Sequence, residues 1–180
     1  VYVKMPVFSF SKLKKVDTVL GPEMKSTGEI IGKDVNLPKA LYKGFIASGV
    51  NVPDYGTALM TVSDKDKAEI IPLAKRLISL GYHIVATTGT GKALEAEGIK
   101  VDVIEKINEN SNDILDAIRD GRINLVVNTM TEGKTSETDG FLIRREAVEN
   151  NIPCLTSLDT AEALLQAMET IHFQLEDMSK

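Results

Sequence analysis

The stretch "TALMTVSDKDKAEIIPLAKRLISLGYHIVATTGTGKALEAEG" (57–98) decides the fold of this chain. It holds two apolar runs of strand length, 57–62 and 82–87, and a segment of helical period follows each run, at 66–81 and at 91–98. Strands that alternate with helices are typical of a parallel sheet, because two parallel neighbours need a long crossover between them. The stretch therefore predicts a strand–helix–strand–helix unit.

The same alternation continues to the C-terminus. Further strands are predicted at 100–104, 124–129 and 152–157, and further helices at 37–49, 111–121, 140–151 and 159–177. The strand runs lack polar alternation, as expected where both faces of a sheet are buried. We therefore expect an α/β fold, a three-layer αβα sandwich with a five-stranded, mainly parallel sheet. Within helix 66–81, Asp66 is expected to cap the N-terminus, and Pro72 predicts a late start or a bend.

Composition excludes several classes of protein. The chain has 180 residues, 43% of them hydrophobic, and a formal net charge of −5, which gives no basic footprint for nucleic acid or an anionic membrane surface. No apolar run approaches the length that spans a bilayer. Cys154 is the only cysteine, so no internal disulfide can form and a cytoplasmic location is expected. His83 and His172 are far apart in the sequence, and we expect no metal site.

The loop 87–92, "TTGTGK", follows a predicted strand and precedes a predicted helix. It fails the Walker pattern, because alanine stands at positions 86 and 93, and it fails the dinucleotide pattern, which would need glycine at position 94. Small hydroxyl residues and glycines at a helix N-terminus nevertheless favour an anion. The loop therefore predicts a site for a monophosphate or phosphoribosyl group held without magnesium. The alternative is that Thr87, Thr88 and Thr90 only cap the helix.

Other loops reach the same edge, because ligands bind at the carboxyl ends of strands in such sheets. Lys67 and Lys106 could supply positive charge there, and Asn128 and Thr129 could donate hydrogen bonds to hydroxyls or to a base. Two arginines follow the polar loop 129–140, and they either pair with a neighbouring domain or form helix surface; these are Arg144 and Arg145. We find no nucleophile beside a histidine and no paired carboxylates suited to catalysis, so the loops are expected to bind rather than react.

A family resemblance adds to this reading. The stretch "MPVFSFSKLKKVDTVLGPEMKSTGEIIG" (5–32), and above all its block "LGPEMKSTGE" (20–29), closely resembles the end of the second synthetase half in the large chain of carbamoyl-phosphate synthase. The rest, with "ALMTVSDKDK" and "ATTGTGKALEAEGI", resembles the methylglyoxal-synthase-like allosteric domain that follows it there. The implied division is 1–36 as a remnant of the upstream ATP-grasp region, 37–55 as helix and linker, and 56–180 as the allosteric domain.

The resemblance also implies a function. The whole enzyme makes carbamoyl phosphate from glutamine, bicarbonate and ATP, for pyrimidine and arginine synthesis, and its glutaminase small chain is a partner. ATP and Mg²⁺ or Mn²⁺ would serve the synthetase regions, so no cofactor and no catalytic residue is expected here. The expected effectors are uridine monophosphate, phosphoribosyl pyrophosphate, inosine monophosphate or ornithine. The implied effector contacts are Lys67, Thr87, Thr90, Lys106, Asn128, Asp139, Leu142, Ile143 and, near ornithine, Thr156. The family's second threonine after the asparagine is replaced by Met130 here, unless a one-residue insertion brings Thr131 to that place.

Three alternatives remain open at this point. Methylglyoxal synthase has a similar Thr-Gly loop and is a lyase that eliminates phosphate, but its first loop carries histidine where this chain has "VSDKDK" (62–67). The cyclohydrolase half of the bifunctional purine enzyme shares similar loops but lacks "LGPEMKSTGE". The third alternative is a scaffold domain with a vestigial pocket.

Overall fold

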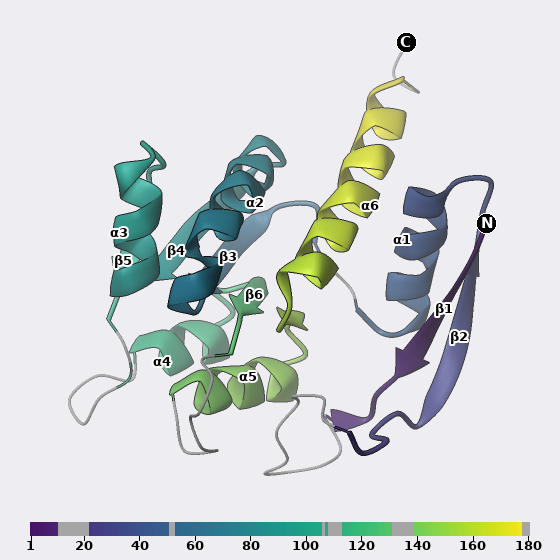
Figure 1. The fold of residues 1–180 in the computed structure, drawn as a ribbon, viewed down its shortest axis with the longest axis horizontal. Coiled ribbons are helices and arrows are strands. Elements are labelled where there is room, and N and C mark those ends of the chain that lie inside the picture. The colour runs from purple at the N-terminus through teal and green to yellow at the C-terminus, as the bar shows by residue number, and fades with distance from the viewer. Residues whose placement is uncertain (11–21, 51–52, 106, 108–112, 131–138, 178–180) are drawn as a thin grey trace.

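Five parallel strands form the centre of the computed structural model, which describes residues 1–10, 22–50, 53–105, 107, 113–130 and 139–177 (Figure 1). The strands are β3 (Gly56–Thr61), β4 (Tyr82–Thr87), β5 (Asp102–Ile104), β6 (Leu125–Asn128) and β7 (Cys154–Leu155). Their order is β5-β4-β3-β6-β7, and each neighbouring pair is parallel. The predicted five-stranded parallel sheet is confirmed.

Helices cover both faces of this sheet. They are α2 (Lys67–Ser79), α3 (Thr88–Ala96), α4 (Asp113–Arg119), α5 (Asp139–Glu149) and α6 (Leu158–Asp177). One apolar cluster joins the sheet to α2, α3 and α6, and a second cluster joins it to α4 and α5. This arrangement confirms the predicted αβα sandwich. Among the described helices, none combines the length and the apolar character that crossing a membrane requires.

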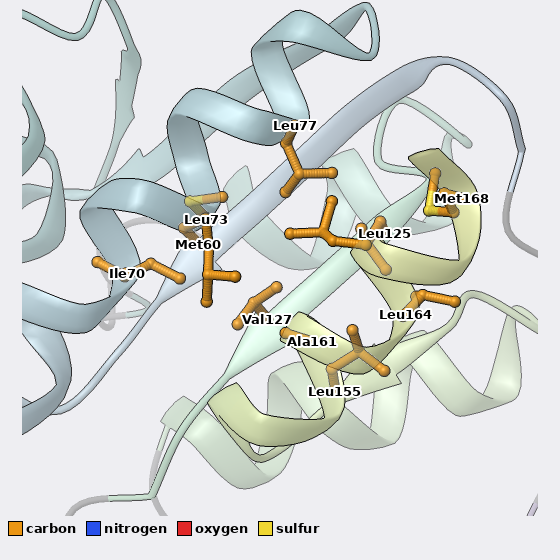
Figure 2. Close-up of a pocket in the computed structure, with 11 residues that line it drawn as sticks. Met60, Ile70, Leu73, Leu77, Leu125, Val127, Leu155, Ala161, Leu164 and Met168 are labelled. Carbon is orange, nitrogen blue, oxygen red and sulfur yellow. The ribbon is translucent and has the colours of Figure 1, made fainter. Parts of the chain in front are cut away.

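The larger cluster packs tightly between the sheet, α2 and α6 (Figure 2). Met60 and Val127 of the sheet face Leu73 of α2 and Leu164 of α6 there. An apolar cavity of about 10 Å³ lies between them. A cavity of that size without polar partners does not hold water. This region is therefore core and not a ligand site.

The N-terminal part forms a separate small layer. Strands β1 (Tyr2–Val7) and β2 (Gly28–Lys33) pair antiparallel, and α1 (Leu37–Ala47) packs against both of them and against α6. Helix α1 begins where the Asn36 side chain accepts a hydrogen bond from the Lys39 amide at 3.0 Å. Phe45 of α1 is buried in the same cluster as α6. The helix expected within 37–55 is therefore present, and it contacts both neighbouring parts of the chain.

Two helix boundaries correct the sequence prediction. Helix α3 begins at Thr88 and not at 91, so the expected turn is already the first turn of the helix. Helix α2 begins at Lys67, after the 3₁₀ turn Asp64–Asp66, and runs through Pro72 without a late start. Burial of Ile70 and Leu73 on either side of the exposed proline outweighs the one helix bond that it removes.

Candidate functional site

The candidate site lies at the carboxyl ends of β3, β4 and β6. After β3 the chain enters α2 on one face of the sheet, and after β6 it continues to α5 on the opposite face. The neighbouring strands β3 and β6 therefore flank the point where the winding direction reverses. Open parallel sheets bind ligands in the crevice at such a point.

Ser63, Asp66 and Thr129 form a polar cluster between the ends of β3 and β6. The Ser63 amide donates to Thr129 Oγ1 at 2.9 Å, and the Ser63 hydroxyl donates to Asp66 Oδ2 at 2.6 Å. The Thr129 hydroxyl also bonds to the Asp66 carboxylate. Asp66 was expected to cap α2, but its side chain makes no capping bond and instead holds the two loops together. The Thr129 hydroxyl was predicted to bond to a ligand, but in the structure it donates its hydrogen bond to Asp66.

These bonds also set the ionisation of Asp66. Burial alone would raise the pKa of its carboxyl group, but the hydrogen bonds from Ser63 and Thr129 and the charge of Lys65 outweigh burial, so the pKa lies below its usual 3.8. A lowered folded-state pKa means that the carboxylate stabilises the fold above about pH 4 and that this stabilisation is lost as the pH falls through the folded-state pKa.

Asp66→Asn should therefore make the free energy of unfolding depend less on pH in the acid range. We expect the variant to lose about 1 kcal/mol of unfolding free energy at neutral pH, through weaker hydrogen bonds, and to match the wild type once the wild-type carboxyl is protonated. Urea unfolding from neutral pH down to about pH 2 measures this. The exposed Asp120→Asn is the control; equal pH profiles for the two variants would contradict the role given to Asp66.

Lys67 lies against the first turn of α3. A Cβ placed on Gly89 would be 3.4 Å from Lys67 Nζ, so the ammonium group faces the backbone of the Thr-Gly loop. Lys67 also pairs with Asp64 at 2.6 Å, but the Asp64 side chain is 96% exposed. Such an exposed ion pair contributes little, so a ligand anion can displace it. The structure thus brings together two predicted site features that are about 20 residues apart in sequence.

The three threonines of that turn have different roles. Thr90 is only 1% exposed, and its hydroxyl accepts a hydrogen bond from the Val62 amide at 3.2 Å, which ties α3 to the loop after β3. Thr87 is buried at the capping position but makes no side-chain capping bond. Thr88 is exposed. The interpretation that the threonines merely cap the helix is therefore wrong for Thr87, and Thr88 is the hydroxyl most open to a ligand.

Asn128 lies at the end of β6 beside the start of α5. Its Oδ1 accepts a hydrogen bond from Arg144 Nη1 at 2.8 Å, and both side chains are almost fully buried. Arg144 was expected to be helix surface or to pair with a neighbouring domain, and at 4% exposed it is not helix surface. The missed signal is Gly140, one helical turn earlier, whose lack of a side chain leaves room for the guanidinium group.

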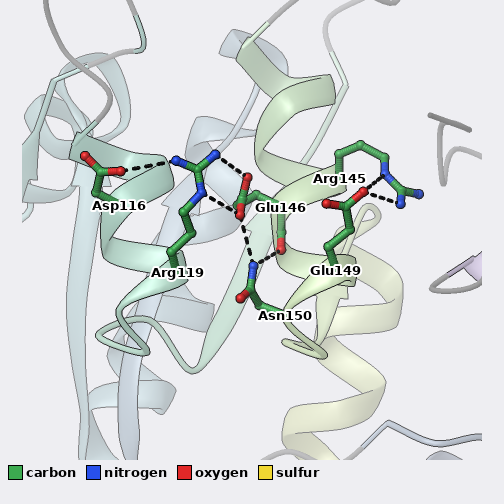
Figure 3. A network of polar contacts seen from close by, with 6 residues as sticks. All are labelled: Asp116, Arg119, Arg145, Glu146, Glu149 and Asn150. Carbon is green, nitrogen blue, oxygen red and sulfur yellow. Dashed lines mark hydrogen bonds and ion pairs between the residues drawn. The ribbon is translucent and has the colours of Figure 1, made fainter. Parts of the chain in front are cut away.

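The neighbouring Arg145 is not helix surface either, but it does contact the N-terminal part of the chain, which was the other alternative. It is 7% exposed and donates to Glu149 Oε1 at 2.6 Å and to the backbone carbonyl of Phe10 at 3.3 Å. Close by, Arg119 of α4 donates two bonds to Glu146 of α5 (Figure 3). Helix α5 is thus held both by α4 and by the N-terminal segment.

The remaining candidates are spread along the same edge. Asp139 opens α5 and is half-buried, Leu142 is 39% exposed, and Ile143 is 1% exposed in the core. Thr156, directly after β7, is half-buried. Lys106 and Thr131 lie outside the described residues. Among the residues that are described, no group of three or more His, Cys, Asp or Glu side chains could hold a metal ion.

Comparison with known proteins agrees with this fold. Residues 69–156 match the family model of the MGS-like domain, so an MGS-like domain is present. A crystal structure of methylglyoxal synthase from Elizabethkingia anophelis NUHP1 superposes with a TM-score of 0.53 at 19% identity, covering 63% of this chain and 79% of that one. A crystal structure of ForH gives a TM-score of 0.48 at 23% identity over 64% of this chain and 79% of its own. At these identities, the likeness to methylglyoxal synthase supports the fold alone.

Proposed function

We propose that the MGS-like domain present in this chain is the effector-binding domain of a carbamoyl-phosphate synthase large chain. It binds a nucleotide or phosphoribosyl effector through its phosphate at the carboxyl edge of the sheet and leaves it chemically unchanged. The observation that carries the proposal is the Lys67 ammonium group beside Gly89 in the first turn of α3. Backbone amides at a helix N-terminus and a lysine point charge are a common pair of phosphate ligands.

The assignment to carbamoyl-phosphate synthase rests on sequence. The block "LGPEMKSTGE" (20–29) resembles that family's synthetase end and precedes the MGS-like domain, as it does in the family. Carbamoyl phosphate would be made by synthetase regions and a glutaminase partner outside this chain, in the cytoplasm. An effector bound here would act on them only through its different affinity for two states of the enzyme.

Binding without turnover is the other half of the proposal. Methylglyoxal synthase is a lyase, and a lyase of this kind needs a general acid or base beside its substrate, here at the carboxyl edge of the sheet. His83 stands near the opposite end of β4 and pairs with the exposed Asp102 at 2.8 Å. The carboxylate of Asp66 is engaged by two hydroxyl groups. Both arrangements favour a binding site.

Titration calorimetry tests the proposal directly. The chain is titrated with uridine monophosphate, phosphoribosyl pyrophosphate, inosine monophosphate and ornithine, and we expect micromolar to millimolar binding of at least one phosphorylated ligand. Incubation with dihydroxyacetone phosphate should release no methylglyoxal. Absence of heat with all four ligands at low salt would overturn effector binding, and methylglyoxal production would favour the lyase.

Lys67→Ala should weaken binding of the phosphorylated effector about 10- to 100-fold, because it removes a charge-assisted hydrogen bond. Lys75→Ala is the matched control, since it removes the same charge from an exposed position two turns further along α2. The Kd values of both variants and of the wild type are compared by calorimetry. Equal losses in the two variants would mean that only net charge matters and that Lys67 is not a ligand.

A further inference from the structure

The side-chain amide of Asn128 is held in one orientation by a buried arginine. Asn128 is 2% exposed and Arg144 is 4% exposed, and their Oδ1 and Nη1 atoms lie 2.8 Å apart. A guanidinium group can only donate hydrogen bonds, so the amide atom that faces it must be the oxygen. The amino group of Asn128 is then the end of the amide that is left for another contact.

Gly140 makes this pairing possible. A Cβ at that position would lie 3.0 Å from Arg144 Nη1 and 3.4 Å from Asn128 Oδ1, so any side chain would press on both partners. Gly140 is the second residue of α5, and Asn128 is the last residue of β6. The pair therefore joins the carboxyl end of β6 to the first turns of α5, at the edge where the effector is proposed to bind.

We propose that Arg144 is a positioning residue that makes Asn128 a hydrogen-bond donor toward the effector. The inference rests on the proposed function and adds the chemistry of the recognised group, which must be a hydrogen-bond acceptor: an oxygen of a phosphate, ribose or base carbonyl, or a ring nitrogen of the base. An amino group at that place on the ligand would face the amino group of Asn128, and two donors cannot form a hydrogen bond. Because the amide is shielded from water, the hydrogen bond is stronger there than at an exposed position, and the mismatch costs more.

Asn128→Asp is the sharpest variant. Aspartate has nearly the same shape and still accepts from Arg144, but it has no amino group. We expect the fold to be as stable as the wild type and the effector affinity to fall about tenfold or more. Asn128→Leu also lacks the donor but adds no negative charge. An equal loss of affinity in this variant would show that the missing donor, and not the added charge of aspartate, weakens binding.

Variants of Arg144 test the positioning role. Arg144→Met should lower affinity about tenfold through an amide that is free to rotate, and Arg144→Lys should recover part of that loss by donating to the same oxygen. The amide resonances of the Asn128 side chain report this without depending on stability. They should shift when uridine monophosphate is added to the wild type, and in Arg144→Met the same shift should need about tenfold more ligand.

Ribose 5-phosphate and uridine monophosphate distinguish where the acceptor lies. A loss in Asn128→Asp with both ligands places the acceptor on the ribose or phosphate, and a loss with the nucleotide alone places it on the base. Wild-type affinity in Asn128→Asp, or a loss in Asn128→Asp without one in Asn128→Leu, would overturn the donor role while leaving effector binding intact. Failure of the wild type to bind either ligand would instead count against the proposed function itself.

Discussion

Gly32→Ala is expected to destabilise the chain by about 3 kcal/mol, near the upper end for overpacking a close contact. A Cβ at Gly32 of β2 would lie 2.1 Å from the Ala40 carbonyl oxygen and 2.9 Å from the Gly44 amide nitrogen of α1. Both are backbone atoms, so no rotamer change can relieve the overlap and the helix must move away from the strand. For a chain of this size the loss corresponds to about 6–12 °C in Tm.

Gly28→Ala on the same strand is the matched control. A Cβ there has no atom within 4 Å, so the variant should stay within about 0.5 kcal/mol of the wild type. Thermal unfolding gives the global effect, and hydrogen exchange of the β1, β2 and α1 amides shows whether the N-terminal layer alone opens. If the two variants behave alike in both measurements, the close approach of β2 to α1 is not what stabilises this layer.

Periodicity was sufficient to predict the sheet, because buried parallel strands and amphipathic helices differ in local pattern. It was insufficient at the start of α3, where threonine and glycine have low helix propensity. Burial of Thr90 and Leu94 against the sheet overrides that propensity and extends the helix to Thr88. The sequence could not show this, because the stabilising contacts come from other elements.

The candidate site was predictable to a similar degree. The rule that ligands bind at carboxyl strand ends placed Lys67 and the Thr-Gly loop at one edge, and in the described structure the Lys67 ammonium group lies beside Gly89 of that loop. Asp66 and Arg144 were misjudged, because a carboxylate at a helix start is usually a cap and an arginine is usually exposed. Their partners, Thr129 and Asn128, lie on a different strand end, and only the fold brings them together.

Ile143→Ala and Leu142→Ala should separate the core from the binding surface of α5. Ile143 is 1% exposed and packs in the cluster between the sheet, α4 and α5, so its truncation should cost about 3 kcal/mol of unfolding free energy. Leu142, its neighbour, is 39% exposed, and its truncation should change stability by less than about 0.5 kcal/mol. Denaturant unfolding of both variants measures the difference.

The two variants should differ in effector affinity in the opposite sense to their difference in stability. The family resemblance of the sequence implied both positions as effector contacts, but the Ile143 side chain cannot reach a ligand without leaving the core, because it is buried in one cluster with Leu59, Val126 and apolar residues of α4. Measured where each variant is folded, affinity should be unchanged in Ile143→Ala and reduced several-fold in Leu142→Ala, since only the exposed side chain can lie against a bound nucleotide. Reduced affinity in Ile143→Ala with unchanged affinity in Leu142→Ala would mean that effector binding depends on how α5 packs on the sheet and not on contact with its exposed face.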